Sequence, residues 1–171
     1  MDRRRLPSGV VPIIPEPGQE SVWDYPRPPR VETVPLRVRA IVDGRPLGDS
    51  LRALRVLETA GAPVYYLPFG DVALDVLRAT DRSTVCEWKG SASYVDYISG
   101  ERHIPMVGWT YSDPNPGYEA LRDHLAFYAA RIDEAWVGDE RATPQPGGFY
   151  GGWVTGAIVG PIKGEPGSLG W

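Results

Sequence analysis

The segment of residues 84–97, TVCEWKGSASYVDY, contains the side chains best suited to chemistry. It holds the single cysteine, Cys86, and an isolated lysine, Lys89, three residues later. A cation beside a thiol favours the nucleophilic thiolate, so this pair could serve redox or acyl-transfer chemistry. In a regular strand, positions 86 and 89 point to opposite faces, unless Gly90 distorts the run. A buried, inert cysteine is the commoner role of a lone thiol, and both interpretations remain open here.

Other patterns of catalytic residues are missing from the sequence. His103 and His124 are the only histidines, and no H-x-x-x-H or C-x-x-C spacing accompanies them. No two acidic residues are two positions apart, which disfavours two-metal nucleotidyl transfer. The glycines form no phosphate-binding loop, and Lys163-Gly164 lacks the Ser or Thr that would follow. We therefore expect no metal site and no cofactor.

Aromatic rings recur on neighbouring predicted strands, with a few charges among them. Such rings are typical of a small-molecule pocket, although they would also form an ordinary β core with tyrosine hydroxyls at its rim. We predict a cleft that binds a small, partly apolar molecule. Arg55 and Lys89 would hold a polar or anionic end of this ligand, and Glu58 would orient one of them. The predicted aromatic lining consists of Tyr65, Trp88, Tyr94, Trp109, Tyr111 and Phe127.

Short strands separated by glycine and proline turns must position these side chains. Residues 34–43 alternate apolar and polar side chains from Leu36 onward, and Asp43-Gly44 predicts a hairpin turn. Further strands are expected at residues 64–67, 84–89, 91–98, 104–111, 124–128 and 133–137.

Two of the predicted segments leave questions of conformation. Residues 49–61 place leucines at helical spacing but also contain a β-prone run, and we favour a strand there. In residues 104–111, Val107, Trp109 and Tyr111 are expected to share one face. Residues 70–77 should include one helical turn that begins near Asp71. The prediction is a mainly β fold with one or two short helical turns.

The two ends of the chain differ from the middle in composition. Residues 1–30 are rich in proline and predict an extended arm. Residues 141–171 are rich in glycine but too aromatic for a flexible linker. We expect this tail to pack through Phe149, Tyr150, Trp153 and Trp171 against the 31–140 domain or a partner subunit.

Length and charge restrict the possible classes of protein. With 171 residues, the chain suits one domain with tails. Its net charge of -4 argues against nucleic-acid binding. A single cysteine permits no disulfide within the chain. No apolar run of about 20 residues exists, and the proline-broken start does not match a signal peptide. We predict a cytoplasmic protein without membrane association.

Several ordered motifs resemble the domain-of-unknown-function 427 family, with the domain at about residues 34–137 and the glycine-rich tail resembling a common extension of it. These motifs are RALRVLET, PVYYLP, CEWKGSASY, GWTYSDPNP, HLAFYAARID and PGGFYGGW. The resemblance implies a β-tent, in which two antiparallel sheets lean together over a cleft. It places Cys86, Trp88, Lys89 and Tyr94 on the family's core motif, and Tyr65, Tyr66, Trp109 and Tyr111 on its aromatic strands.

The resemblance does not extend to every property of related proteins. Some tents carry zinc, but their paired cysteines are missing here, so no metal is implied. Some relatives carry a nucleotidyltransferase-like label, which no motif in this chain supports. Three hypotheses follow: a small-molecule-binding module, an enzyme that uses Cys86 or Lys89, and an interaction protein whose tail forms a homodimer.

Overall fold

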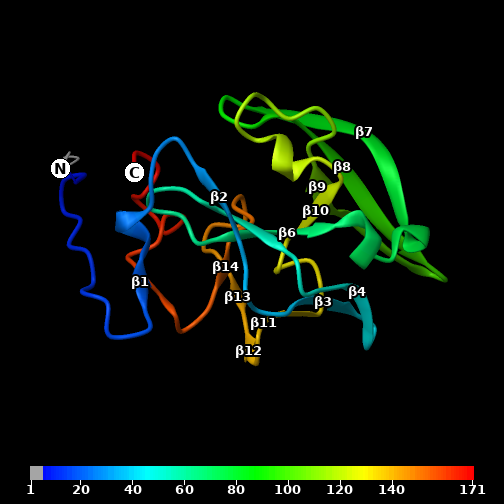
Figure 1. The fold of residues 1–171 in the computed structure, drawn as a ribbon, viewed down its shortest axis with the longest axis horizontal. Coiled ribbons are helices and arrows are strands. Elements are labelled where there is room, and N and C mark those ends of the chain that lie inside the picture. The colour runs from blue at the N-terminus through cyan, green and yellow to red at the C-terminus, as the bar shows by residue number, and fades with distance from the viewer. Residues whose placement is uncertain (1–5) are drawn as a thin grey trace.

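The chain forms a mainly β structure, as the sequence predicted. The computed structural model describes residues 6–171, and residues 1–5 of the predicted arm lie outside the described part. The larger of its two main sheets is antiparallel throughout (Figure 1). In spatial order its strands are β2 (Arg30–Thr33), β5 (Leu54–Leu57), β6 (Val64–Pro68), β10 (His124–Phe127), β9 (Arg102–Thr110), β8 (Gly90–Ser99) and β7 (Leu77–Cys86).

A second antiparallel sheet contains the predicted hairpin. Its strands are, in order, β12 (Glu140–Arg141), β11 (Glu134–Val137), β3 (Val38–Val42) and β4 (Arg45–Ser50). The inward residues of β3 are buried, as their alternation predicted. Asp43 and Gly44 both have positive φ angles, which suits a tight turn between twisted strands. Leu36 departs from the prediction, because it precedes β3 and is 50% exposed.

A continuous hydrophobic core fills the space between these two sheets. Val38, Ala40 and Val42 from β3 pack in one cluster with Leu67 of β6 and Phe127 of β10. The sheets approach so closely that a Cβ at Gly48 would lie 2.7 Å from a methyl carbon of Leu67. Side chains therefore occupy the centre of the expected cleft between the two sheets.

The ambiguous segments also adopt definite conformations. Residues 49–61 contain β5, as favoured, whereas Asp49 and Ser50 end β4. The helical turns are short 3-10 helices: η1 (Val22–Asp24), η2 (Phe69–Asp71), η3 (Leu74–Val76) and η4 (Glu119–Leu121). No helix within residues 6–171 is long and apolar enough to cross a membrane. The predicted strand at residues 84–89 ends earlier, because β7 stops at Cys86 and a turn precedes β8.

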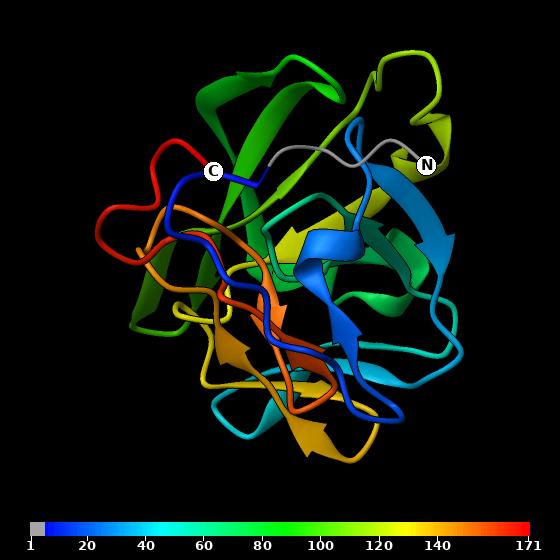
Figure 2. The same ribbon diagram turned by 90° about the vertical axis from the view of Figure 1, so that its left-hand side faces the viewer.

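The two ends of the described chain lie side by side (Figure 2). β1 (Glu20–Ser21) pairs in parallel with β15 (Ile158–Val159), and β13 (Thr143–Pro144) pairs with β14 (Trp153–Val154). Trp23 and Trp171 meet edge to face, with ring centroids 5.4 Å apart. The tail thus packs against the N-terminal segment of its own chain.

Trp153 connects the tail to the main core. It is 0% exposed, its ring lies 5.4 Å from that of Tyr65, and its indole N–H donates to the carbonyl of Phe127 at 2.9 Å. Phe149, by contrast, is 79% exposed, so not every tail ring packs inward as expected. Trp153 is therefore the main anchor of this segment.

An ion cluster joins the two sheets at their edge. Arg102 of β9 contacts the carboxylates of Asp43 and Asp133, and its Nη2 lies 2.7 Å from Asp133. Asp133 also accepts the backbone N–H of Asp43 at 2.7 Å. Two hydrogen bonds lower the pKa of Asp133 to about 2. The bond from Arg102 has the larger effect, and the bond from the backbone N–H of Asp43 has the second largest.

Replacing Trp153→Ala should lower the free energy of unfolding by about 3–5 kcal/mol, because it leaves a cavity in a close-packed core. Phe149→Ala is the matched control, and its effect should stay within about 0.5 kcal/mol. Urea denaturation measures both. Equal effects of the two substitutions would mean that the tail is not anchored through Trp153.

The Arg102–Asp133 contact should make stability depend on pH. The folded pKa of Asp133 lies below its unfolded value of about 3.9, so the stabilisation is present above that pH and disappears as pH falls toward 2. The difference in unfolding free energy between wild type and Arg102→Met should therefore shrink between about pH 5 and 2. Arg122→Met, which removes an exposed pair with Asp113, should show a small difference at every pH. A pH-independent gap for Arg102→Met would contradict this assignment.

Candidate functional site

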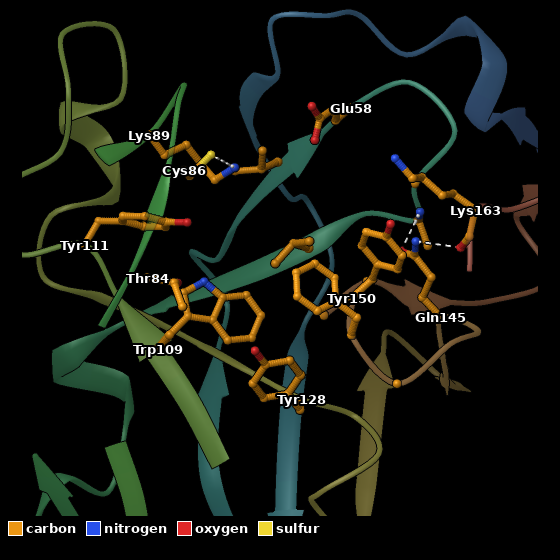
Figure 3. A pocket seen from close by; sticks show the side chains of 18 of the residues that line it. Glu58, Thr84, Cys86, Lys89, Trp109, Tyr111, Tyr128, Gln145, Tyr150 and Lys163 are labelled. Atoms are coloured by element: carbon orange, nitrogen blue, oxygen red, sulfur yellow. Dashed lines mark hydrogen bonds between the residues drawn. The ribbon is translucent and has the colours of Figure 1, made fainter. Parts of the chain in front are cut away.

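A pocket of about 540 Å³ lies on the face of the larger sheet that points away from the filled core. The sheet forms its floor, the β7–β8 turn forms one side, and the tail forms the opposite side (Figure 3). Val56, Val64 and Trp109 contribute to the floor from β5, β6 and β9. The cavity combines aromatic rings with charged groups, whereas a cavity of about 530 Å³ at Arg37, Asp49 and Arg52 has no aromatic lining.

Stacked and edge-on rings form the aromatic part of this pocket. Trp109 lies 4.6 Å from Tyr128 between ring centroids, and its indole N–H donates to the Tyr66 hydroxyl at 3.2 Å. Burial raises the pKa values of Tyr66 and Tyr111, and it raises that of Tyr128 to about 12. These phenols therefore remain neutral near pH 7, as donors and acceptors of hydrogen bonds.

Cys86 and Lys89 meet at the side of the pocket. Lys89 Nζ donates to Cys86 Sγ at 3.3 Å and lies 5.9 Å from the centroid of the Tyr111 ring. The contact arises because residues 87–89 turn the chain, whereas a continuous strand would have separated the two side chains. Cys86 is only partly buried, so the fully buried, inert thiol that the sequence left open is not observed.

The tail supplies the opposite wall through close contacts. A Cβ at Gly151 would lie 2.1 Å from the Trp109 ring, so only glycine permits this approach. The buried side chain of Gln145 accepts the N–H of Ala62 at 3.1 Å and donates to the Lys163 carbonyl at 2.9 Å. Gln145 thus links the tail, at its own position and at Lys163, to the loop between β5 and β6 of the larger sheet.

The charged groups around the pocket are mostly basic. Glu58 lies 3.7 Å from Arg27. Arg131 lies 4.0 Å from the centroid of the Tyr128 ring and donates to the Met106 carbonyl. Lys163 donates to the carbonyl oxygen of Trp171 at 2.8 Å. Lys89 and Lys163 lie on opposite sides of the pocket (Figure 3).

The pocket contains six of the ten residues singled out in the sequence. Strand alternation accounts for Tyr94 of β8 and Trp109 of β9, whereas Glu58, Lys89 and Tyr111 lie just beyond the ends of strands. The residues brought together are Glu58, Cys86, Lys89, Tyr94, Trp109 and Tyr111.

The other four residues lie outside this pocket. Phe127 is fully buried in the core between the sheets, and Tyr65 faces the same way, next to Trp153. Trp88 packs against the aromatic cluster without lining the cavity. Arg55 lies with Tyr65 at a separate cavity of about 280 Å³. The structure therefore separates these four residues from the other six.

Arg55 has carboxylate partners of its own. It pairs with Glu20 of β1 and with Glu32 of β2. Burial lowers its pKa, but the hydrogen bonds to both carboxylates outweigh burial and raise it. Arg55 thus joins the N-terminal segment to the sheet, which corrects its predicted position at the ligand.

Sequence reasoning missed several residues of the pocket. Tyr128 and Arg131 follow β10, and Gln145, Tyr150 and Lys163 belong to the tail. The alternation of Phe127 and Tyr128 carried one usable signal, since only one of the two could face the floor. The position of the tail depends on long-range contacts that no local pattern encodes.

Within residues 6–171, no three His, Cys, Asp or Glu side chains gather as a metal site would require. His103 lies 2.9 Å from Asp96, and His124 lies 2.8 Å from the Arg122 carbonyl. Neither histidine lines the pocket. Among the described residues, Cys86 therefore lacks a neighbouring imidazole that could act as its general base.

Comparison with known proteins identifies a family but no individual relative. The model of a family described as a domain of unknown function (DUF427) matches residues 30–138. No curated protein matches the sequence. The matched range ends before the tail, so Gln145, Tyr150 and Lys163 are pocket residues outside it.

Gln145→Ala should destabilise the protein by about 1–3 kcal/mol, because it leaves the buried N–H of Ala62 without a partner. The matched control is Gln19→Ala, since Gln19 donates to the Gly156 carbonyl at an exposed position. Urea denaturation compares the two, and hydrogen exchange should show faster exchange at Ala62 in Gln145→Ala alone. Unchanged exchange at Ala62 would contradict the role of Gln145 as a fastener.

Proposed function

The chain belongs to the DUF427 family, a domain of unknown function, and we propose that it binds a small, partly apolar molecule in the pocket beneath its tail. The observation that carries this proposal is the tilted pair of Trp109 and Tyr128 rings, which lines a cavity of about 540 Å³ rather than solid packing. Ligand pockets in proteins commonly measure about 300–1,000 Å³ and combine apolar walls with a few polar groups.

The polar groups have positions that suit a ligand. Thr84 Oγ1 lies 2.8 Å from the Tyr94 hydroxyl, and both residues line the cavity. Glu58 and Lys89 lie at the rim (Figure 3). Aromatic floors provide affinity through burial, while polar groups at the edge determine orientation. A binding module needs no further catalytic group, which agrees with the chemistry of this site.

Four predictions from the sequence stay proposals beside this one. The β-tent assignment rests on the family resemblance. In a tent formed by the two main sheets, the pocket lies on the outer face of the larger sheet. A homodimer through the tail and a cytoplasmic location also remain predictions. The reactive-thiol hypothesis has one supporting contact, between Lys89 and Cys86, but no base or second thiol accompanies it.

Filling the pocket tests the proposed function. Val64 is half-buried on β6 and lines the floor, so Val64→Phe should occupy the space of the ligand while keeping a β-prone residue. In a thermal-shift screen of small aromatic molecules, compounds that raise the Tm of wild type should lose their effect in Val64→Phe.

Val11→Phe is the control, because Val11 is exposed and does not line the pocket. It should respond to the same compounds as wild type. Compounds that stabilise Val64→Phe as strongly as wild type would place binding elsewhere. A screen in which no small molecule stabilises the wild-type protein would reject the binding function.

A further inference from the structure

Both lysines of the chain lie on this one pocket. The sequence contains only Lys89 and Lys163, 74 positions apart, and the fold brings them to opposite sides of the same cavity (Figure 3). Lys89 comes from the β7–β8 turn, and Lys163 comes from the tail. Both side chains are half-buried, so their charges are partly shielded from water and act strongly on a ligand.

These lysines have no Asp or Glu side chain as a partner. Lys89 contacts the thiol of Cys86, and Lys163 contacts a main-chain oxygen of Trp171. Arg131 donates to the Met106 carbonyl and lies over the Tyr128 ring. Among residues 6–171, no Asp or Glu carboxylate oxygen lies within 4.0 Å of any of the three cations.

The charge of the pocket is opposite to that of the chain. The chain has a net charge of -4 at pH 7, yet four basic residues and a single carboxylate line the cavity. Glu58 lies beside Arg27, which leaves Lys89, Arg131 and Lys163 without an Asp or Glu partner among the described residues there. A concave site with one sign of charge concentrates the field and attracts ligands of the opposite sign.

The shape of the floor restricts the ligand further. The rings of Trp109 and Tyr128 provide a broad apolar surface, and Gly151 brings the tail backbone directly against Trp109. Aromatic rings pack best against other flat rings. The combination fits a flat hydrophobic body that carries a charged group at one edge.

We propose that the ligand of this pocket is a planar aromatic anion, such as an aromatic carboxylate or sulfonate. Its rings lie against Trp109 and Tyr128, and its anionic group contacts one lysine at the rim while the other lysine contributes to the positive field of the pocket. This assignment rests on the proposed binding function and defines its ligand class. It replaces the predicted role of Arg55 with Lys163 and Arg131, and it retains Lys89.

Two fluorescent probes that differ only in charge provide the test. Anilinonaphthalene sulfonate is an aromatic anion with a flat naphthalene unit, and phenylnaphthylamine has the same rings without the sulfonate. Wild type should bind the sulfonate at least about tenfold more tightly than the neutral probe, at one site per chain. Higher salt should weaken sulfonate binding and leave the neutral probe unchanged.

Variants that lack the lysine charges test whether the preference for the sulfonate arises in this pocket. Lys89→Met with Lys163→Met should weaken the sulfonate by about tenfold or more while leaving phenylnaphthylamine binding unchanged. Arg45→Met removes an arginine that does not line this pocket and should alter neither probe. Val64→Phe should abolish the binding of both.

Each remaining outcome overturns a defined part of the account. Equal affinity of wild type for the two probes would reject the anionic ligand class but retain an aromatic-binding pocket. Sulfonate binding that survives in the double lysine variant or in Val64→Phe would place the anion outside the pocket. Binding of neither probe would reject the aromatic-binding function together with the ligand class.

Discussion

The insertion of Trp153 into the core is the constraint on which the rest of the structure depends. Its buried ring packs against Tyr65, and its indole N–H bonds to the chain at Phe127. Because Trp153 is fixed, the two residues before it must cross the edge of the sheet within contact of Trp109 and Gln145. Glycine at positions 151 and 152 permits this approach. The tail therefore forms one wall of the pocket above the sheet.

The pocket and the core use opposite faces of one sheet. Leu67 and Phe127 face the smaller sheet, whereas Tyr66 and Trp109 face the tail. The first face is filled and supplies stability through burial. The second is incompletely filled, and within residues 6–171 its cations Lys89, Arg131 and Lys163 have no Asp or Glu partner. Such a group is costly to desolvate unless a ligand or water completes its contacts, so the charge pattern is more informative about function than the rings alone.

Local patterns predicted many of the strands but not which side chains face the core and which face the pocket. The alternation in β3 and the Asp43-Gly44 turn followed from side-chain period and turn chemistry. The assignment of rings to faces failed at Tyr65 and Phe127, because both strands are buried on two sides and offer no polar face to orient them. A local irregularity had a similar effect: Met106 adopts a positive φ, and Val107 therefore lies in the core cluster, apart from Trp109. The tail wall depends on contacts between distant residues, which periodicity cannot reveal.

The indole N–H signal of Trp109 offers the most direct test of the account. In a nitrogen–proton correlation spectrum of the labelled protein, titration with naphthalene sulfonate should shift this signal progressively and saturably. The indole signals of Trp153, buried in the core, and Trp136, on the other sheet, should stay in place. A Trp109 signal that does not move, or signals of all three that move together, would contradict a ligand site between the sheet and the tail.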